Sequence, residues 1–293
     1  MVQHRILTKK DMDAAQRVYE ICFPNDEEAF INYYFQKRTK PNWILGAFDG
    51  ERLIGTVHML PQTARFFGVD KSVCLVVGVA TLPEERGKGV AQSMLNAAFE
   101  VMRERGFCLT ILKAATEELE RFYEKFGFKA FAHRDVYDLT LSDFSGVEDI
   151  ETHKPSAAEL LKLYTAYAEG FNGMRVRTLK DMELLLEELT TYESDVLCGG
   201  GAYAICYFEN GQAHTLELAG DKPLQLLKAL SKKYGHIHAA VCANAPLISG
   251  KAFTYETFNL YKVLNENTLF TGFSAGVRDR FKQKEAFYSM EMY

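Results

Sequence analysis

The residues with the most evident chemistry form one loop, residues 86–91, which reads Arg-Gly-Lys-Gly-Val-Ala. A valine-rich apolar run typical of a buried strand precedes this loop, and a helical period of apolar residues begins at Val90. The first N–H groups of a helix have no intrahelical partner, and the helix dipole adds partial positive charge there. Glycines let the backbone approach a phosphate closely, and Arg86 and Lys88 add positive charge. The loop is therefore predicted to bind the phosphates of a ligand.

The spacing of the glycines narrows the type of phosphate loop. A Walker loop requires Gly-x-x-x-x-Gly-Lys-Ser/Thr, but Gly89 is followed by valine. A dinucleotide fingerprint requires Gly-x-Gly-x-x-Gly, but Gln92 stands where the third glycine belongs. The remaining pattern, Arg-x-x-Gly-x-Ala, resembles the pyrophosphate loop of the GNAT acyltransferases, which bind acetyl-coenzyme A.

A second motif lies one predicted helix and one predicted strand further on. Tyr123 stands four residues before Gly127-Phe128, which is similar to the second GNAT signature. The resemblance implies that Tyr123 protonates the coenzyme A thiolate, and a phenol with a pKa of about 10 suits a thiolate of comparable basicity. It also implies that the pantetheine arm lies along strand 77–79, which must then separate from the strand at 107–112. The cofactor-binding residues implied are Val77, Val79, Arg86, Gly87, Lys88, Gly89, Val90 and Ala91.

The general base is left open by the sequence. Glu117, His58, His133 and Asp26 are candidates, and an amine that is already neutral through a water relay needs no dedicated base. A further candidate is the terminal carboxylate of Tyr293, because the tail 286–293 alternates like a docked strand. The resemblance supports Tyr293, because in the related aminoglycoside enzymes the terminal carboxylate enters the active site.

The predicted acceptor site lies at the joint between the first two helices, which borders the acceptor side of a GNAT fold. Asp26, Glu27 and Glu28 occupy this joint. Carboxylates attract a cation at a distance and aromatic faces accept it at close range. The acceptor is therefore predicted to be a small-molecule amine, polyamine-like or aminoglycoside-like. The flanking aromatic residues are Phe23, Phe30, Tyr33 and Tyr34.

The order of predicted elements indicates an α/β (α+β) chain with a mixed twisted sheet flanked by helices. In the first half, a strand, two helices and two hairpins lead into the glycine loop. In the second half, helices, a hairpin at Asn210-Gly211, a strand, a helix and a strand recur in that order, but 219–222 carry no cofactor loop. This layout resembles the tandem GNAT-like proteins related to the aminoglycoside acetyltransferases of the enhanced-intracellular-survival type. It implies an active GNAT domain at 1–145 and a degenerate GNAT-like domain at 146–293, whose final strand docks on the first.

Composition limits the alternatives. The chain of 293 residues is 47% hydrophobic and carries a net charge of −5 without a basic block, which argues against nucleic-acid and anionic-membrane binding. No signal-peptide core or membrane-length apolar run is evident, and six dispersed cysteines indicate free thiols in a reducing cytoplasm rather than disulfides or a metal site. Two other functions are open: an acyl-coenzyme A sensor without turnover, and a tRNA-dependent aminoacyl transferase of the peptidoglycan-bridge type, which would need a basic face. Assembly into a homo-oligomer is also open.

Overall fold

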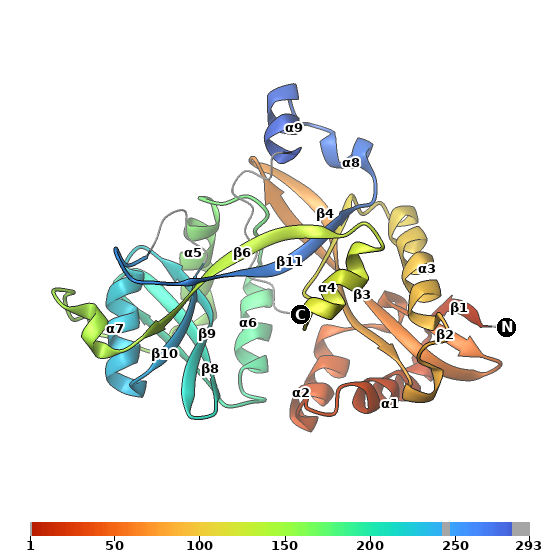
Figure 1. Ribbon diagram of the computed structural model, residues 1–293, viewed down its shortest axis with the longest axis horizontal. Helices are drawn as coiled ribbons and strands as arrows, with labels where there is room; N and C mark the ends of the chain where they lie inside the picture. The colour runs from red at the N-terminus through yellow and green to blue at the C-terminus, as the bar shows by residue number, and fades with distance from the viewer. Residues whose placement is uncertain (1, 242–246, 283–293) are drawn as a thin grey trace.

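One mixed sheet of eleven strands runs through the computed structural model, which describes residues 2–241 and 247–282. The strand order is β1-β2-β3-β4-β5-β11-β6-β10-β9-β8-β7. Figure 1 shows two lobes, with the long strands β6 and β11 crossing from one to the other. The predicted α/β class with a mixed sheet flanked by helices is confirmed. No helix among the described residues has the length and apolar character needed to cross a membrane.

The first lobe is built from the N-terminal half of the chain. Its helix α3 (Val90–Glu104) buries Val90, Met94 and Ala98 against the sheet, as the helical period predicts. The other elements are β1 (Gln3–Ile6), α1 (Met12–Cys22), α2 (Glu28–Tyr33), β2 (Ile44–Asp49), β3 (Arg52–Phe66), β4 (Val69–Thr81), β5 (Leu109–Leu112) and α4 (Glu117–Glu124).

The second lobe repeats this arrangement with a different connection between strand and helix. The hairpin predicted at Asn210-Gly211 is confirmed, and both residues have positive φ, 51° and 76°, as a tight turn between two strands requires. The elements are β6 (Lys129–Leu139), α5 (Ala157–Ala168), α6 (Leu179–Glu188), β7 (Ser194–Gly199), β8 (Ala202–Glu209), β9 (Gln212–Gly220), α7 (Pro223–Tyr234), β10 (Ile237–Val241), β11 (Thr254–Val263), α8 (Glu266–Phe270) and α9 (Ala275–Lys282).

The strand β11 returns from the second lobe to complete the first. It lies between β5 and β6 and is antiparallel to both, with Leu260 opposite Leu112 on β5. Leu260, Leu264 and Phe270 are buried in the core of the first lobe, together with Phe281 on α9. β11 thereby covers the edge of the short strand β5 that faces away from β4. The division into domains at residue 145 stays a prediction. The predicted docking tail, 286–293, lies outside the described residues.

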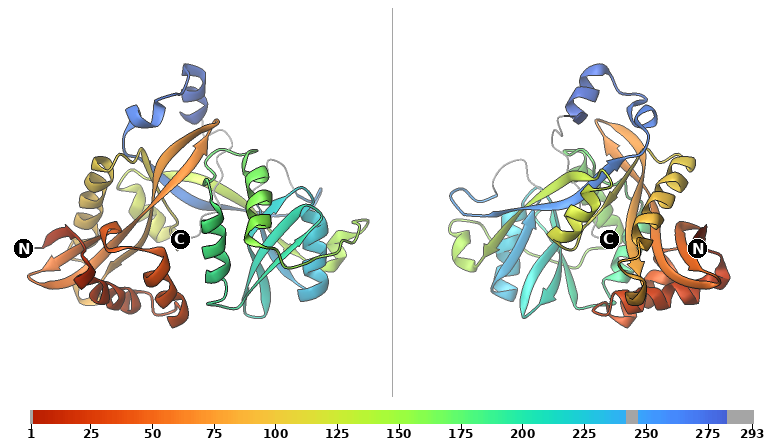
Figure 2. Two further views of the ribbon diagram at one scale, coloured as in Figure 1. Left: turned by 180° about the vertical axis from the view of Figure 1, so that it is seen from behind. Right: turned by 45° about the vertical axis from the view of Figure 1, so that its right-hand side comes forward.

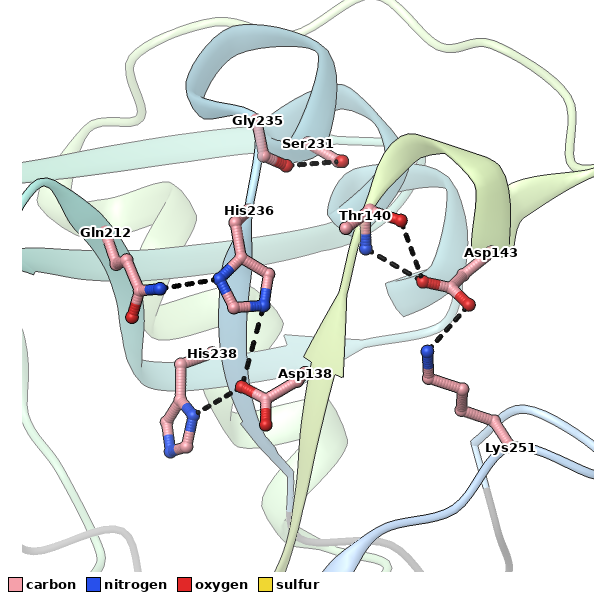
Figure 3. A network of polar contacts seen from close by, with 9 residues as sticks. All are labelled: Asp138, Thr140, Asp143, Gln212, Ser231, Gly235, His236, His238 and Lys251. Carbon is pink, nitrogen blue, oxygen red and sulfur yellow. Dashed lines mark hydrogen bonds and ion pairs between the residues drawn. The ribbon is translucent and has the colours of Figure 1, made fainter.

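Polar contacts lie along β6, β9 and β10 of the second lobe (Figure 3). His238 Nδ1 donates to Asp138 Oδ1 at 3.0 Å, and Gln212 Nε2 donates to His236 Nδ1 at 2.8 Å. Asp143, just after β6, accepts from the Lys251 ammonium at 2.7 Å. These contacts therefore help to hold β6 and the turn after it against the rest of the second lobe.

The lobes also meet at α2 and α6, which face each other across the lower part of the molecule in the left view of Figure 2. The Tyr33 hydroxyl donates to the Leu184 carbonyl at 2.5 Å, and Lys37 pairs with Glu187 at 3.2 Å. Arg38 and Glu188 form a third contact here, with 3.2 Å between Nε and Oε2. These contacts hold the two lobes around a shared cleft.

Candidate functional site

The site begins where β4 and β5 separate. The two parallel strands pair at only three positions, the last of which joins Leu75 to Ile111. Beyond that point β4 continues to Thr81 while β5 ends at Leu112. Residues 76–79 and 112–115 then line opposite sides of a cleft of about 700 Å³. The separation of these strands, which the resemblance requires, is confirmed.

A β-bulge shapes β4 at the mouth of this separation. His58 on β3 pairs with Val77 and Thr56 pairs with Ala80, so Gly78 and Val79 together oppose one residue of β3. Gly78 has a φ of +55°, and a Cβ there would lie 3.1 Å from the His58 ring. A bulge leaves its extra residue outside the ladder. The bulge therefore interrupts the regular β3–β4 register at Gly78 and Val79, beside the point where β4 leaves β5.

Tyr123 lies on α4, beside the same cleft. The side-chain oxygen of Thr116 caps the helix by accepting from the Leu119 N–H at 3.3 Å. Tyr123 is only 7% exposed, lines the cleft, and packs edge-on against Phe122 and Phe128. Burial raises the pKa of the Tyr123 phenol to about 12. The phenol therefore holds its proton at neutral pH, as a proton donor must.

The glycine loop lies just beyond the cleft end of β4. Gly87 and Gly89 have φ of +76° and +79°, and no atom lies within 4 Å of a Cβ built on either residue. Gly89 is the residue before α3, and the first helical hydrogen bond runs from Ser93 N to Gly89 O, so the N–H groups of residues 90–92 precede the helical ladder. Arg86 is held by its Nε bond to the Thr81 carbonyl at 3.2 Å. The exposed loop has the open space and donors that a pyrophosphate needs.

The structure divides the three predicted acceptor acids. Asp26 lines the cleft with Tyr19 and Phe23, and the Tyr19 hydroxyl donates to Asp26 Oδ2 at 2.9 Å. Glu27 and Glu28 are exposed and are not among the described residues that line the cleft; Glu28 begins α2. Asp26 is therefore the member of this set that meets the cleft.

The candidate bases are also separated by the structure. His58 is fully buried beneath the bulge, with Nδ1 2.7 Å from the Tyr34 hydroxyl, and burial lowers its pKa to about 3. An imidazole with that pKa is neutral at pH 7, but it is too weak a base to keep a proton taken from an amine. Glu117 is 88% exposed and pairs with Arg121 on the outer face of α4. The side chain of His133 and all of Tyr293 lie outside the described part of the structure.

The far wall of the cleft is supplied by the second lobe and was not predicted from the sequence. Arg177 forms a two-pronged ion pair with Glu217, at 2.8 and 2.7 Å, and both side chains are buried. The Tyr203 hydroxyl donates to the same carboxylate, and the Arg177 guanidinium lies 4.1 Å from the centre of the Tyr164 ring. Two charged residues 40 positions apart carry no local signal of pairing, although the alternating Arg175-Val-Arg177 resembles a strand.

Comparisons with known proteins agree with this geometry. A family model described as an acetyltransferase (GNAT) domain matches residues 3–131. No curated protein sequence matches the chain significantly.

Solved structures share the fold over nearly the whole chain. A GCN5-related N-acetyltransferase from Kribbella flavida is 15% identical, with a TM-score of 0.75, over 92% of this chain and 72% of that one. A probable N-acyltransferase from Enterococcus faecalis, whose function is described as unknown, is 15% identical with a TM-score of 0.76, over 92% and 74%. Eis1 from Mycobacterium abscessus is 14% identical with a TM-score of 0.70, over 90% and 74%. Residues 3–131, which contain the separated strands, the glycine loop and Tyr123, therefore match the acetyltransferase (GNAT) domain family.

Proposed function

We propose that this protein is an acetyl-coenzyme A-dependent N-acetyltransferase that transfers acetyl to a primary amine by direct attack on the thioester. The observation that carries the proposal is the separation of β4 from β5 at Leu75, with the bulge at Gly78 beside it. An ordinary parallel pair would have continued and closed this space. Here an open cleft is lined by residues 76–79 of β4, residues 112–115 and Tyr123.

The cofactor would be held at two places. Residues 86–91 would bind the pyrophosphate through the free N–H groups at the start of α3 and the charges of Arg86 and Lys88. The strand 77–79 would pair with the pantetheine arm as an added strand, because its β5 side is open beyond Leu75. The cofactor supplies the acetyl thioester. The Val79 N–H, at the bulge, would then stabilise the negative charge that develops on the carbonyl oxygen.

Two side chains would complete the reaction. The Tyr123 phenol, protonated at neutral pH, would donate its proton to the departing sulfur. Asp26, held by the Tyr19 hydroxyl, would attract and orient a cationic amine against the aromatic residues of the first lobe. The carboxylate of Tyr293 stays a candidate base.

The acceptor would be a small cationic amine, because Asp26 is accompanied by Tyr19, Phe23 and Phe30 on the first-lobe wall. The arginines that line the cleft are matched by carboxylates: Arg38 of the first lobe by Glu188, and on the opposite wall Arg175 by Asp181 and Arg177 by Glu217. This wall therefore does not require an acidic acceptor. We place the reaction in the cytoplasm, in keeping with the free thiols at the five described cysteines.

A panel of small amines tests this function through the release of free thiol from acetyl-coenzyme A. The panel would include polyamines, aminoglycosides and amino acids, with the acetylated product identified by mass. We expect thiol release that depends on an amine and falls about 100-fold in Tyr123→Phe. Tight cofactor binding without release for any amine would instead indicate a sensor.

A further inference from the structure

A second cluster of reactive side chains lies at the outer edge of the second lobe, away from the cleft. His153, Glu159 and Cys198 each place one ligand atom within 4.8 Å of the other two. The three residues belong to three separate segments: the connection after β6, the first turn of α5, and the strand β7. Dispersed cysteines argued against a metal site in the sequence, but the fold brings a histidine and a glutamate to one of them.

The backbone fixes two members of the cluster on one face. His153 and Cys198 exchange two backbone hydrogen bonds, both of 2.9 Å, in an antiparallel bridge. The side chains of such a directly opposed pair project from the same face of the sheet. The imidazole and the thiol are therefore held on the same side by main-chain geometry.

The third member is positioned by the start of α5. Ser156 caps this helix and accepts from the Glu159 N–H at 3.2 Å, which places Glu159 in the first turn. Its two carboxylate oxygens lie 2.9 and 3.1 Å from His153 Nε2. Lys154, next to His153 in the sequence, pairs with Asp195. No lysine or arginine is paired with Glu159 among the described residues.

The chemistry of the cluster suits one class of ligand. A thiolate, an imidazole and a carboxylate are all ligands that Zn²⁺ accepts, at about 2.0–2.3 Å in tetrahedral geometry. Tetrahedral ligands at that distance lie about 3.5 Å from one another, which small side-chain rotations would achieve here. Cys198 is buried at the base of the cluster, whereas His153 is 57% exposed at its mouth. This arrangement provides an entry path and room for a water as fourth ligand.

We propose that His153, Glu159 and Cys198 form a binding site for Zn²⁺, with water as the fourth ligand. The site would join the connection after β6, the start of α5 and the terminal strand β7. Because β7 is the last strand of the sheet, the ion would hold the covering segment against an otherwise open edge. The site is independent of acetyl transfer in the first lobe.

Cobalt(II) titration of the metal-free full-length chain tests the site. We expect the visible bands of a tetrahedral Co²⁺ ion and a near-ultraviolet thiolate-to-cobalt band, both removed by Zn²⁺. Cys198→Ser should abolish the thiolate band. Cys206→Ser is the matched control, because Cys206 is also a buried thiol of the second lobe but lies outside the cluster. An unchanged thiolate band in Cys198→Ser, or no thiolate band in the parent chain, would overturn the proposal.

A second variant keeps the test valid if Cys198→Ser does not fold. His153→Gln changes an exposed side chain, and we expect it to weaken Zn²⁺ binding at least about tenfold in a competition assay. His238→Gln changes another partly exposed histidine of the same lobe and should leave the affinity unchanged. Equal affinity in His153→Gln and the parent would exclude the imidazole as a ligand and contradict the site.

Discussion

The two lobes make the same strand-to-helix turn with opposite results. In the first lobe, β4 leads through an exposed loop whose glycines have open space around them. In the second, β9 leads through Gly220 into α7, and a Cβ at Gly220 would lie 2.3 Å from the Gly201 carbonyl oxygen. The first turn leaves room for a ligand, whereas the second is filled by its own backbone. A repeated fold therefore does not repeat the site.

The strand pairs differ in the same way. In the second lobe β9 also carries an extra residue, Leu216, at its bulge, and pairs with β10 only at two positions. There, however, the Thr215 hydroxyl lies 2.8 Å from the Ala240 N–H and 3.2 Å from the Ala240 carbonyl. This side chain bridges the space that stays open between β4 and β5. The difference indicates that the open space between β4 and β5, and not the bulge alone, distinguishes the first lobe from the second.

The largest expected effect comes from the proton donor in the first lobe. Tyr123→Phe should lower kcat about 100-fold while cofactor affinity stays nearly constant, because the phenol acts on the leaving sulfur and not on the bound cofactor. Steady-state kinetics and calorimetry with coenzyme A measure the two quantities separately. Equal turnover in the variant would return Tyr123 to a packing role between Phe122 and Phe128.

A pair of glycine substitutions tests the contrast between the lobes directly. Gly89→Asp places a negative charge at the start of α3 and should weaken acetyl-coenzyme A binding at least about tenfold. Gly211→Asp is the matched control, since Gly211 also has positive φ and open space but lies in the second-lobe hairpin. Both variants strain the backbone, so thermal unfolding of each gives the common stability cost. Similar cofactor affinity in the two variants would contradict the loop assignment.

Thr215→Val should lower the stability of the second lobe without changing cofactor binding in the first. The hydroxyl is buried and its loss leaves the Ala240 N–H without that partner, which should lower the free energy of unfolding by about 1–3 kcal/mol. Cofactor affinity should not change, because the substitution leaves the space between β4 and β5 as it is. Denaturant unfolding and calorimetry test the two halves of this expectation. A large loss of cofactor affinity would mean that the lobes do not act separately.

The parts of the site that could be predicted from the sequence are those formed by residues that are adjacent in the chain. The glycine loop and the Tyr123 motif each lie within a short segment, so their residue types and spacing can be recognised from the sequence alone. The wall formed by Arg177 and Glu217, and the insertion of β11 beside β5, depend on pairings between distant segments. The periodicity within one segment does not determine which residues of two distant segments pair with each other. That register is known only from the folded sheet. The contrast between Asp26 and its two neighbours likewise depends on which side chain faces the cleft.

The smallest expected effect comes from comparing Asp26 with its two acidic neighbours, Glu27 and Glu28. Asp26→Asn removes the carboxylate that lines the cleft and should raise the acceptor KM several-fold, roughly 1 kcal/mol of lost attraction, at low and at moderate salt. The double variant Glu27→Gln, Glu28→Gln removes two exposed charges and should raise the KM less than about threefold, with the effect lost at high salt because solvent-exposed charges are screened. The KM for acetyl-coenzyme A should stay fixed in both, which separates acceptor effects from cofactor effects. If the double variant changed the acceptor KM as much as Asp26→Asn at high salt, the acceptor would approach over the outer face of α2 instead of through the cleft.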